Sequence, residues 1–216
     1  MIHEVDACLE AFIEREALAG AGVEVLFDAP TKDWASRRGS PTIDVYLYDV
    51  REDSERRHVG GYLSRDGDGV LVARTEPARY FRLSYLVTAW TQRPVDEHRL
   101  LAALLATFLR YKVLPDDYLV GSLRETNNPV LIEVAKPPPD KRQISEVWSA
   151  LGGELKASLD LVVTAPMSTR PVPVTAPPPS RGAVVSMHGE PGQDSTAEHS
   201  RGPEPAAAAA TGKKKK

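Results

Sequence analysis

The sequence predicts one α+β domain, in which a mixed, mostly antiparallel sheet carries about three packed helices. A disordered carboxy-terminal tail is expected to follow. Residues 79–90 alternate apolar and polar side chains, as a half-buried strand does. Residues 2–13 and 97–110 instead space apolar side chains by three and four, as a helix with one buried face does. From residue 166 on, prolines, alanines and a run of lysines replace that patterning, which predicts a domain over 1–166 and a tail over 167–216.

Composition narrows the class of protein further. A chain of 216 residues can fill one core, and a net charge of -3 argues against a general nucleic-acid binder, which needs a basic stripe. Cys8 is the one cysteine, so neither an intrachain disulfide nor a thiolate metal cluster is expected. No apolar run reaches the roughly 18 residues of a membrane span, and the first residues do not form a signal peptide. We therefore expect a cytoplasmic protein without cofactors.

The first third of the chain reads as one helix and two strands. The helix starts at Ile2 and ends before two glycines, and residues 23–27 alternate as a strand. Residues 31–40 are polar, with glycine and arginine, and are expected to be a loop. Residues 42–50 form the second strand. One of its faces is apolar and the other polar: Ile43, Val45 and Leu47 against Thr42, Asp44, Tyr46 and Tyr48.

Residues 66–69, Asp-Gly-Asp-Gly, lie between two short apolar runs and predict a hairpin, because Asp-Gly supplies the positive φ of a tight turn. A calcium loop is the alternative reading of these aspartates. It lacks the closing glutamate, since Pro77 stands where that residue would be. The hairpin is therefore favoured.

The strand 79–90 is followed by a cluster of acidic, imidazole and basic side chains at residues 96–99, Asp-Glu-His-Arg. Pro94 breaks the strand, and Asp96 stands directly before a helical face that runs from Glu97 to about Arg110. We interpret Asp96 as the N-cap of this helix, with its carboxylate accepting from free backbone N–H groups. This gives the cluster a structural explanation.

The last third of the domain predicts a strand, a short helix and a final strand. The two strands cover residues 130–134 and 158–165. Between them, Asp140 is interpreted as the N-cap of a helix that ends at a pair of glycines.

The candidate acid–base groups for catalysis are Asp96, His98 and Asp116. His98 has no second histidine at helical spacing, and the side chains of the neighbours Asp116 and Asp117 diverge. Residues 1–166 also contain no nucleotide-binding glycine motif, nucleophile elbow or Cys/His metal spacing. We therefore expect neither catalytic nor metal-binding residues, and a small soluble enzyme remains the less favoured alternative.

Five stretches, in this order, resemble the cap, or tail-terminator, family of contractile phage-tail-like injection systems. They include LSYLVTAW followed by DEHRLL, and together they span nearly all of residues 1–166: 27–34, 41–50, 83–90, 96–101 and 148–153. The tail resembles no part of the family.

The resemblance implies a tail-terminator-like fold and a structural function without catalysis. It implies a homo-oligomeric ring, expected to be hexameric, that sits on the last layer of sheath and inner tube and stops their polymerisation. A baseplate or adaptor component of the same particle is the alternative.

A closed ring made by head-to-tail contacts needs two different, complementary patches on each subunit. The 31–40 segment and the polar face of the second strand are the candidates for such patches. The interface residues predicted on this basis are Thr31, Lys32, Asp33, Trp34, Arg37, Arg38, Tyr46 and Tyr48.

Overall fold

The protein is described by a computed structural model that covers residues 1–65, 67, 71–126, 128–137, 144–168 and 172–173. These residues belong to one compact unit, Met1–Ala176. The elements follow in this order: α1 (Ile2–Glu16), β1 (Glu24–Leu26), α2 (Lys32–Ser36), β2 (Thr42–Glu52), η1 (Ser54–Arg56), β3 (Tyr62–Arg65), β4 (Leu71–Thr75), β5 (Arg79–Trp90), α3 (Pro94–Arg110), η2 (Asp116–Tyr118), α4 (Gly121–Glu125), β6 (Leu131–Val134), α5 (Ile144–Ala150), β7 (Ser158–Met167) and β8 (Val172–Pro173).

The main sheet has five strands in the order β1-β2-β5-β7-β6. Only β1 and β2 run parallel; the other three pairings are antiparallel. β5, the strand with the clearest sequence pattern, lies in the centre of the sheet. The predicted fold class, a mixed and mostly antiparallel sheet with packed helices, is confirmed.

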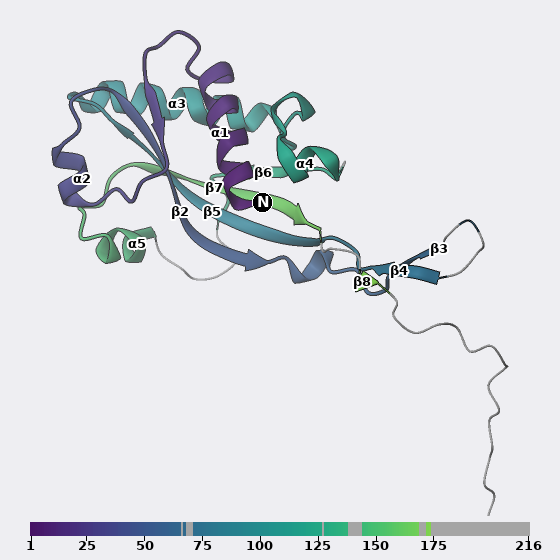
Figure 1. Cartoon of the computed structure of the whole chain (residues 1–216). Helices are drawn as coiled ribbons and strands as arrows, with labels where there is room; N and C mark the ends of the chain where they lie inside the picture. Colours follow the sequence, from purple (N-terminus) through teal and green to yellow (C-terminus); the bar gives the residue numbers. More distant parts are fainter. Residues whose placement is uncertain (66, 68–70, 127, 138–143, 169–171, 174–216) are drawn as a thin grey trace, which may run out of the picture. The chain divides into compact units, whose positions relative to one another are not determined.

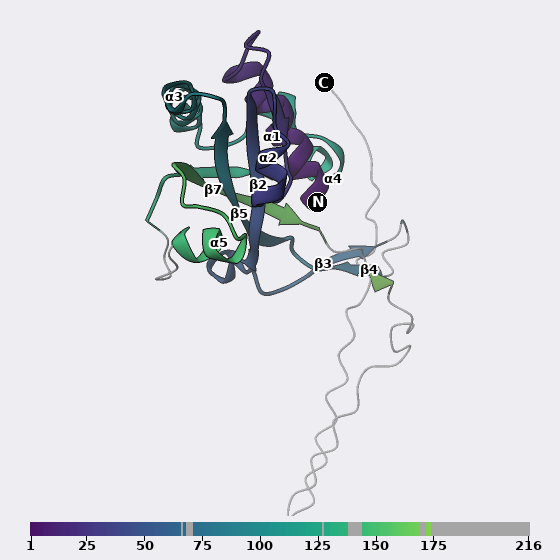
Figure 2. The ribbon, with the colours of Figure 1, turned by 90° about the vertical axis from the view of Figure 1, so that its left-hand side faces the viewer.

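The core lies between one face of this sheet and helices α1 and α3 (Figures 1 and 2). Every second residue of a strand points to the same face of the sheet, and helix residues spaced by three and four share one face. The apolar residues on one face of the sheet therefore pack against the apolar stripes of the two helices. Burying these side chains is the main source of stability of such a domain. The largest fully buried ones include Phe12, Leu9, Ile13, Ile43, Leu83, Tyr85, Leu104 and Phe108.

Helix α4 is held against the start of α1 by one carboxylate. Glu4 accepts a hydrogen bond from the Ser122 backbone N–H at 2.9 Å. Gly121 precedes that serine with φ +54, in the left-handed region, and a Cβ added to it would overlap the Glu4 carboxylate. Both the backbone conformation and the α1–α4 contact therefore need glycine.

Replacing Gly121 with alanine is expected to lower the free energy of unfolding by about 1–3 kcal/mol, from backbone strain and the lost Glu4 hydrogen bond. Chemical denaturation measures this. Gly39→Ala is the control, because a Cβ at Gly39 meets nothing within 4 Å. Equal stability of the two variants would contradict the assignment.

The structure corrects the predicted start of α3. The helix begins at Pro94, with Arg93 at the N-cap and no side-chain cap hydrogen bond. Asp96 is therefore not the N-cap; it lies inside the first turn, and its carboxylate bonds Arg99 instead. The physical reason is that proline at the first helical position has the required φ and lacks only an N–H that no helix bond needs. A strand breaker was thus also a helix start.

The segment predicted as a loop contains a helix. Residues Lys32–Ser36 form α2, and the Thr31 side chain accepts from the Trp34 backbone N–H at 3.2 Å as its N-cap. A helix of five residues is too short to show a periodic apolar pattern, so only the capping threonine could have indicated it.

Two sequence expectations lie outside the described residues. Asp140, predicted as an N-cap, is one of them; the helix that it would begin is described from Ile144. Most of the expected tail is the other. The described structure continues past residue 166, since β7 runs to Met167 and β8 follows it.

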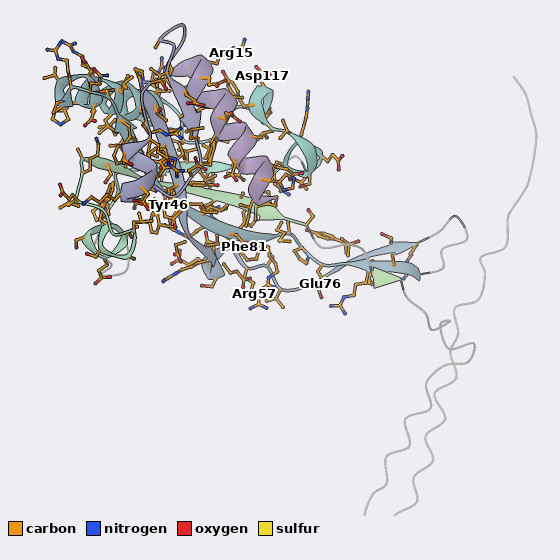
Figure 3. All side chains as sticks on the ribbon, turned by 60° about the vertical axis from the view of Figure 1, so that its left-hand side comes forward. Arg15, Tyr46, Arg57, Glu76, Phe81 and Asp117 are labelled. Carbon is orange, nitrogen blue, oxygen red and sulfur yellow. The ribbon has the colours of Figure 1, made fainter. Side chains whose placement is uncertain are left out.

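A second, three-stranded sheet has the order β3-β4-β8, and we call it the arm. It continues the main sheet in register. Arg79 pairs with Met167 in the main sheet, and five residues farther along each strand Arg74 pairs with Val172 in the arm. The antiparallel pairing of β5 with β7 is thus resumed by β4 and β8. Figure 3 shows Tyr46, Phe81 and Glu76 in this order along the sheet toward the arm.

Candidate assembly surface

Helix α2 is attached to the sheet through one tryptophan. Trp34 is the buried residue of α2 and is 5% exposed. Its indole N–H donates to the Asp28 carboxylate at 2.8 Å, and its ring meets Trp90 edge-on, with 5.3 Å between centroids. The Arg38 guanidinium lies over the same ring, 4.9 Å from its centroid. Trp34 therefore anchors the predicted interface segment to the sheet, and the Arg38 side chain packs against the Trp34 ring.

A buried carboxylate lies next to this anchor. Asp44, on the polar face of β2, is 0% exposed and accepts from the Asp28 backbone N–H at 3.1 Å. Burial raises its pKa to about 8; that hydrogen bond and the charge of Arg38 act in the opposite direction, and the charge of Asp28 raises it further. Asp44 Oδ2 and Arg38 Nε are both buried without a hydrogen-bond partner in the described part of the chain. These two atoms could therefore form hydrogen bonds that the described part of the fold does not supply.

Trp90 also contacts the segment after α5. The Lys156 ammonium lies over the Trp90 ring, 4.3 Å from the centroid, and forms an ion pair with Glu97. Glu97 also accepts from the Thr91 backbone N–H at 3.1 Å. Trp90, the last residue of β5, therefore joins α2, the start of α3 and the chain that enters β7.

A cleft of about 670 Å³ opens at this end of the sheet, and we call it the end cleft. Its volume lies within the range of about 300–1,000 Å³ typical of ligand clefts. Apolar residues of the segment between α1 and β1 and of α3 line it, together with Trp90: Ala17, Leu18, Ala21, Val23, Leu100 and Ala103. Three arginines also line it, namely Arg38, Arg93 and Arg99, with Asp96 as the one acidic lining residue.

Tyr46 and Tyr48 lie farther along β2 and are half-buried. The β2–β5 register shifts between Leu47 and Asp49, which makes Tyr48 the extra residue of a β-bulge. Its hydroxyl donates to the Asp160 carboxylate at 2.7 Å. Burial, and then the hydrogen bond to that carboxylate, raises the pKa of Tyr48. Both tyrosines thus remain partly accessible on the polar face of the sheet.

The predicted interface residues fall into two groups. Thr31 to Arg38 belong to α2 and its flanks, where Lys32, Asp33 and Arg37 are exposed and Trp34 is not. Tyr46 and Tyr48 form the second group, on β2. Pattern reasoning missed Arg93 and Arg99, which join Arg38 only because β5 and α3 return the chain to α2. No local motif predicts that meeting.

The residues considered for catalysis do not come together as a catalytic set. His98, Asp116 and Asp117 are exposed, and Asp96 pairs with Arg99 at 3.1 Å. Cys8 is fully buried, and burial raises the pKa of its thiol. Among the described residues, no three His, Cys, Asp or Glu side chains are placed to hold a metal ion. Nor does any described helix have the length and apolar character needed to cross a membrane.

Comparison with known proteins gives a family and a fold. The family described as the Pvc16 N-terminal domain matches residues 4–182. No curated protein matches the chain.

Two solved structures share the fold. One is described as the sheath/tube terminator, in the extended state, of PVC, an extracellular contractile injection system; it superposes with a TM-score of 0.60 at 19% identity over 87% of this chain. The other is the tube-terminating cap of the anti-feeding prophage, with a TM-score of 0.56 at 19% identity over 84% of this chain. The chain spans 63% and 60% of the lengths of these two proteins.

Proposed function

The chain belongs to the Pvc16 N-terminal domain family, and from this membership we propose that it is a structural cap of a contractile injection system. In this role it forms a ring on the distal end of the sheath and inner tube and stops their polymerisation. The observation that carries the proposal is the fold shared, over 87% of the chain, with a protein described as a sheath/tube terminator. The partners are further copies of the chain, the sheath protein and the inner-tube protein.

The geometry supports a ring. Subunits that close head to tail need two unlike surfaces, and the chain has unlike features at the two ends of its central strands. β5 begins next to the arm and ends at Trp90 in the end cleft. The ring is expected to be hexameric, and its assembly is expected in the bacterial cytoplasm.

The contacts with sheath and tube are proposed to involve the exposed residues around α2 and the two tyrosines of β2. Lys32, Asp33 and Arg37 are charged and exposed, while Tyr46 and Tyr48 offer half-exposed aromatic rings. Aromatic residues and arginine are enriched in protein interfaces. The proposed function is binding without catalysis, in keeping with the two solved neighbours, of which one is described as a terminator and the other as a cap.

Particle length tests the proposal. Particles produced without this chain should have sheaths and tubes of widely scattered length in electron micrographs, and restoring the chain should return a narrow distribution. A baseplate component would behave differently, because its loss would prevent particles from starting rather than from stopping. Unchanged lengths without the chain would contradict the capping role.

A further inference from the structure

Leu155 is an exposed apolar side chain beside an acidic one. It lies in the segment that follows α5 and is 70% exposed, and Glu154 before it is exposed as well. Lys156 after it is held within the chain, because its ammonium pairs with Glu97 and lies over the Trp90 ring. This double contact fixes the backbone next to Leu155. The segment therefore exposes a leucine and a carboxylate at a defined position.

The end cleft has the complementary character. Apolar side chains make up much of its lining, so it can bury a leucine. Arg93 and Arg99 line it and are exposed, and its three arginines outnumber its one acidic lining residue, Asp96. An occupant that is apolar and carries an acidic group fits this combination.

Other exposed apolar side chains of the described chain fit the cleft less well. Leu63, on β3, is 56% exposed but pairs across the arm with Arg74. Val113 is 39% exposed and follows Lys112. A positive group beside the docked side chain would meet the arginines of the cleft, and like charges disfavour docking. Charge therefore favours Leu155, which Glu154 precedes.

The two surfaces lie on opposite sides of one end of the sheet. Figures 1 and 2 show α3 on one side of the sheet and α5 on the other. Leu155 lines a smaller cavity, of about 390 Å³, on the side of α5. Ala35 and Trp90 line both cavities, so α2 and the last residue of β5 form the wall between them. Since Leu155 does not lie in the cleft of its own chain, its occupancy of a cleft requires another molecule.

We propose that Leu155 of one copy inserts into the end cleft of the next copy, with Glu154 facing Arg93 and Arg99. This inference rests on the proposed ring and names the contact that closes it. The contact is heterologous, because it joins two different surfaces, and repeating it at a fixed rotation gives a closed ring. Neighbouring residues complete the interface, since a stable one buries about 800 Å² on each partner.

Shortening the leucine tests the contact. Leu155→Ala should weaken the association between copies about tenfold or more, because most of the buried apolar group is lost. The matched control is Leu109→Ala, the same substitution at a leucine that is 67% exposed and lies outside the cleft. Light scattering over a dilution series of the full-length chain measures the mass at each concentration.

Filling the cleft should have the same effect as shortening the leucine. Ala103→Phe places a ring where the leucine of the next copy would insert, because Ala103 lines the cleft. Ala106→Phe is the matched control, since Ala106 is exposed on the same helix and does not line the cleft. Circular dichroism checks the folding of every variant.

A charge exchange shows whether the two surfaces touch. Glu154→Lys alone, and Arg93→Glu with Arg99→Glu in one chain, should each remain near the 23.6 kDa of one chain, because like charges then meet at every contact. The arginine variant is expected to fold, since acidic residues at the start of α3 complement the helix dipole. An equimolar mixture of the two variants should form the ring again, because each contact can then join opposite charges.

The outcomes separate this contact from the proposed function. Rings of wild-type stability in Leu155→Ala or in Ala103→Phe would overturn the contact and leave the ring in place. A mixture of the charge variants that stays monomeric would also overturn it. A wild-type chain that is monomeric at every concentration would contradict the proposed ring and this contact with it.

Discussion

Replacing Trp34 with alanine is expected to lower the free energy of unfolding by about 3–5 kcal/mol, the usual cost of removing a buried tryptophan. The side chain is 5% exposed, and its indole contacts Asp28, Arg38 and Trp90. Helix α2 has five residues and no other buried side chain, so it cannot hold its conformation once this anchor is lost. Loss of α2 would also remove a wall of the end cleft.

Thermal and chemical denaturation measure the effect, and ring formation by light scattering measures its consequence for assembly. Trp34→Phe should lose much less stability, because it keeps most of the packed ring. Lys32→Ala, on the exposed side of the same helix, should be near neutral. A Trp34→Ala variant with wild-type stability would show that α2 is not anchored as described.

Replacing Asp44 with asparagine is expected to remove the fall in stability that Asp44 causes in the wild type between about pH 4 and pH 8. In the wild type the folded pKa is about 8, far above the unfolded value of about 3.9. Across this window the folded state holds a proton that the unfolded state has released, so stability falls as pH rises. The slope is at most about 1.4 kcal/mol per pH unit. Asparagine cannot ionise, so the variant avoids this loss.

The measurement is the free energy of unfolding of both proteins from pH 5 to pH 9, with Asp28 and Arg38, the charged groups that face Asp44, left intact. The free energy of unfolding of Asp44→Asn, relative to that of the wild type, should increase with pH, whatever the difference is at pH 5. Asp33→Asn, at an exposed position nearby, should leave the wild-type slope unchanged. If the free energy of unfolding changes with pH in the same way in the wild type and in Asp44→Asn, the raised pKa of Asp44 is contradicted.

The central strand and the long helices were predictable because their patterns are long enough to be unambiguous. β5 has the predicted bounds, Arg79–Trp90, and its predicted apolar side carries buried Leu83, Tyr85 and Val87. Twelve alternating residues leave little room for another reading. The parallel pairing of β1 with β2 could not be predicted in this way, since a strand of three residues carries no information about its neighbour.

The predictions for α2 and Asp96 were wrong for the same reason. Both lie where one element ends and the next begins, and a residue at such a boundary is compatible with two local structures. Pro94 ends a strand and also starts a helix, and Thr31 belongs to a polar segment and also caps α2. Tertiary contacts decide between such readings. Trp34 reaches Trp90, 56 positions away in the printed sequence, and that contact fixes α2.

The candidate surface was only partly accessible from the sequence. Arg37 and Arg38 belong to a visibly polar segment, whereas Arg93 and Arg99 looked like the flanks of a helix start. The cleft that holds Arg38, Arg93 and Arg99 exists because β2, β5 and α3 bring distant segments to one end of the sheet. Sequence patterns report on single elements, and a cleft between elements requires their arrangement.

The position of the chain on an intact particle tests the central claim most directly. A tag on the full-length chain, labelled with gold and imaged by electron microscopy, should appear at one end of each particle, opposite the baseplate, and at no point along the sheath. Label along the sheath, label at the baseplate end, or particles without bound label would contradict the account that this chain ends the polymer.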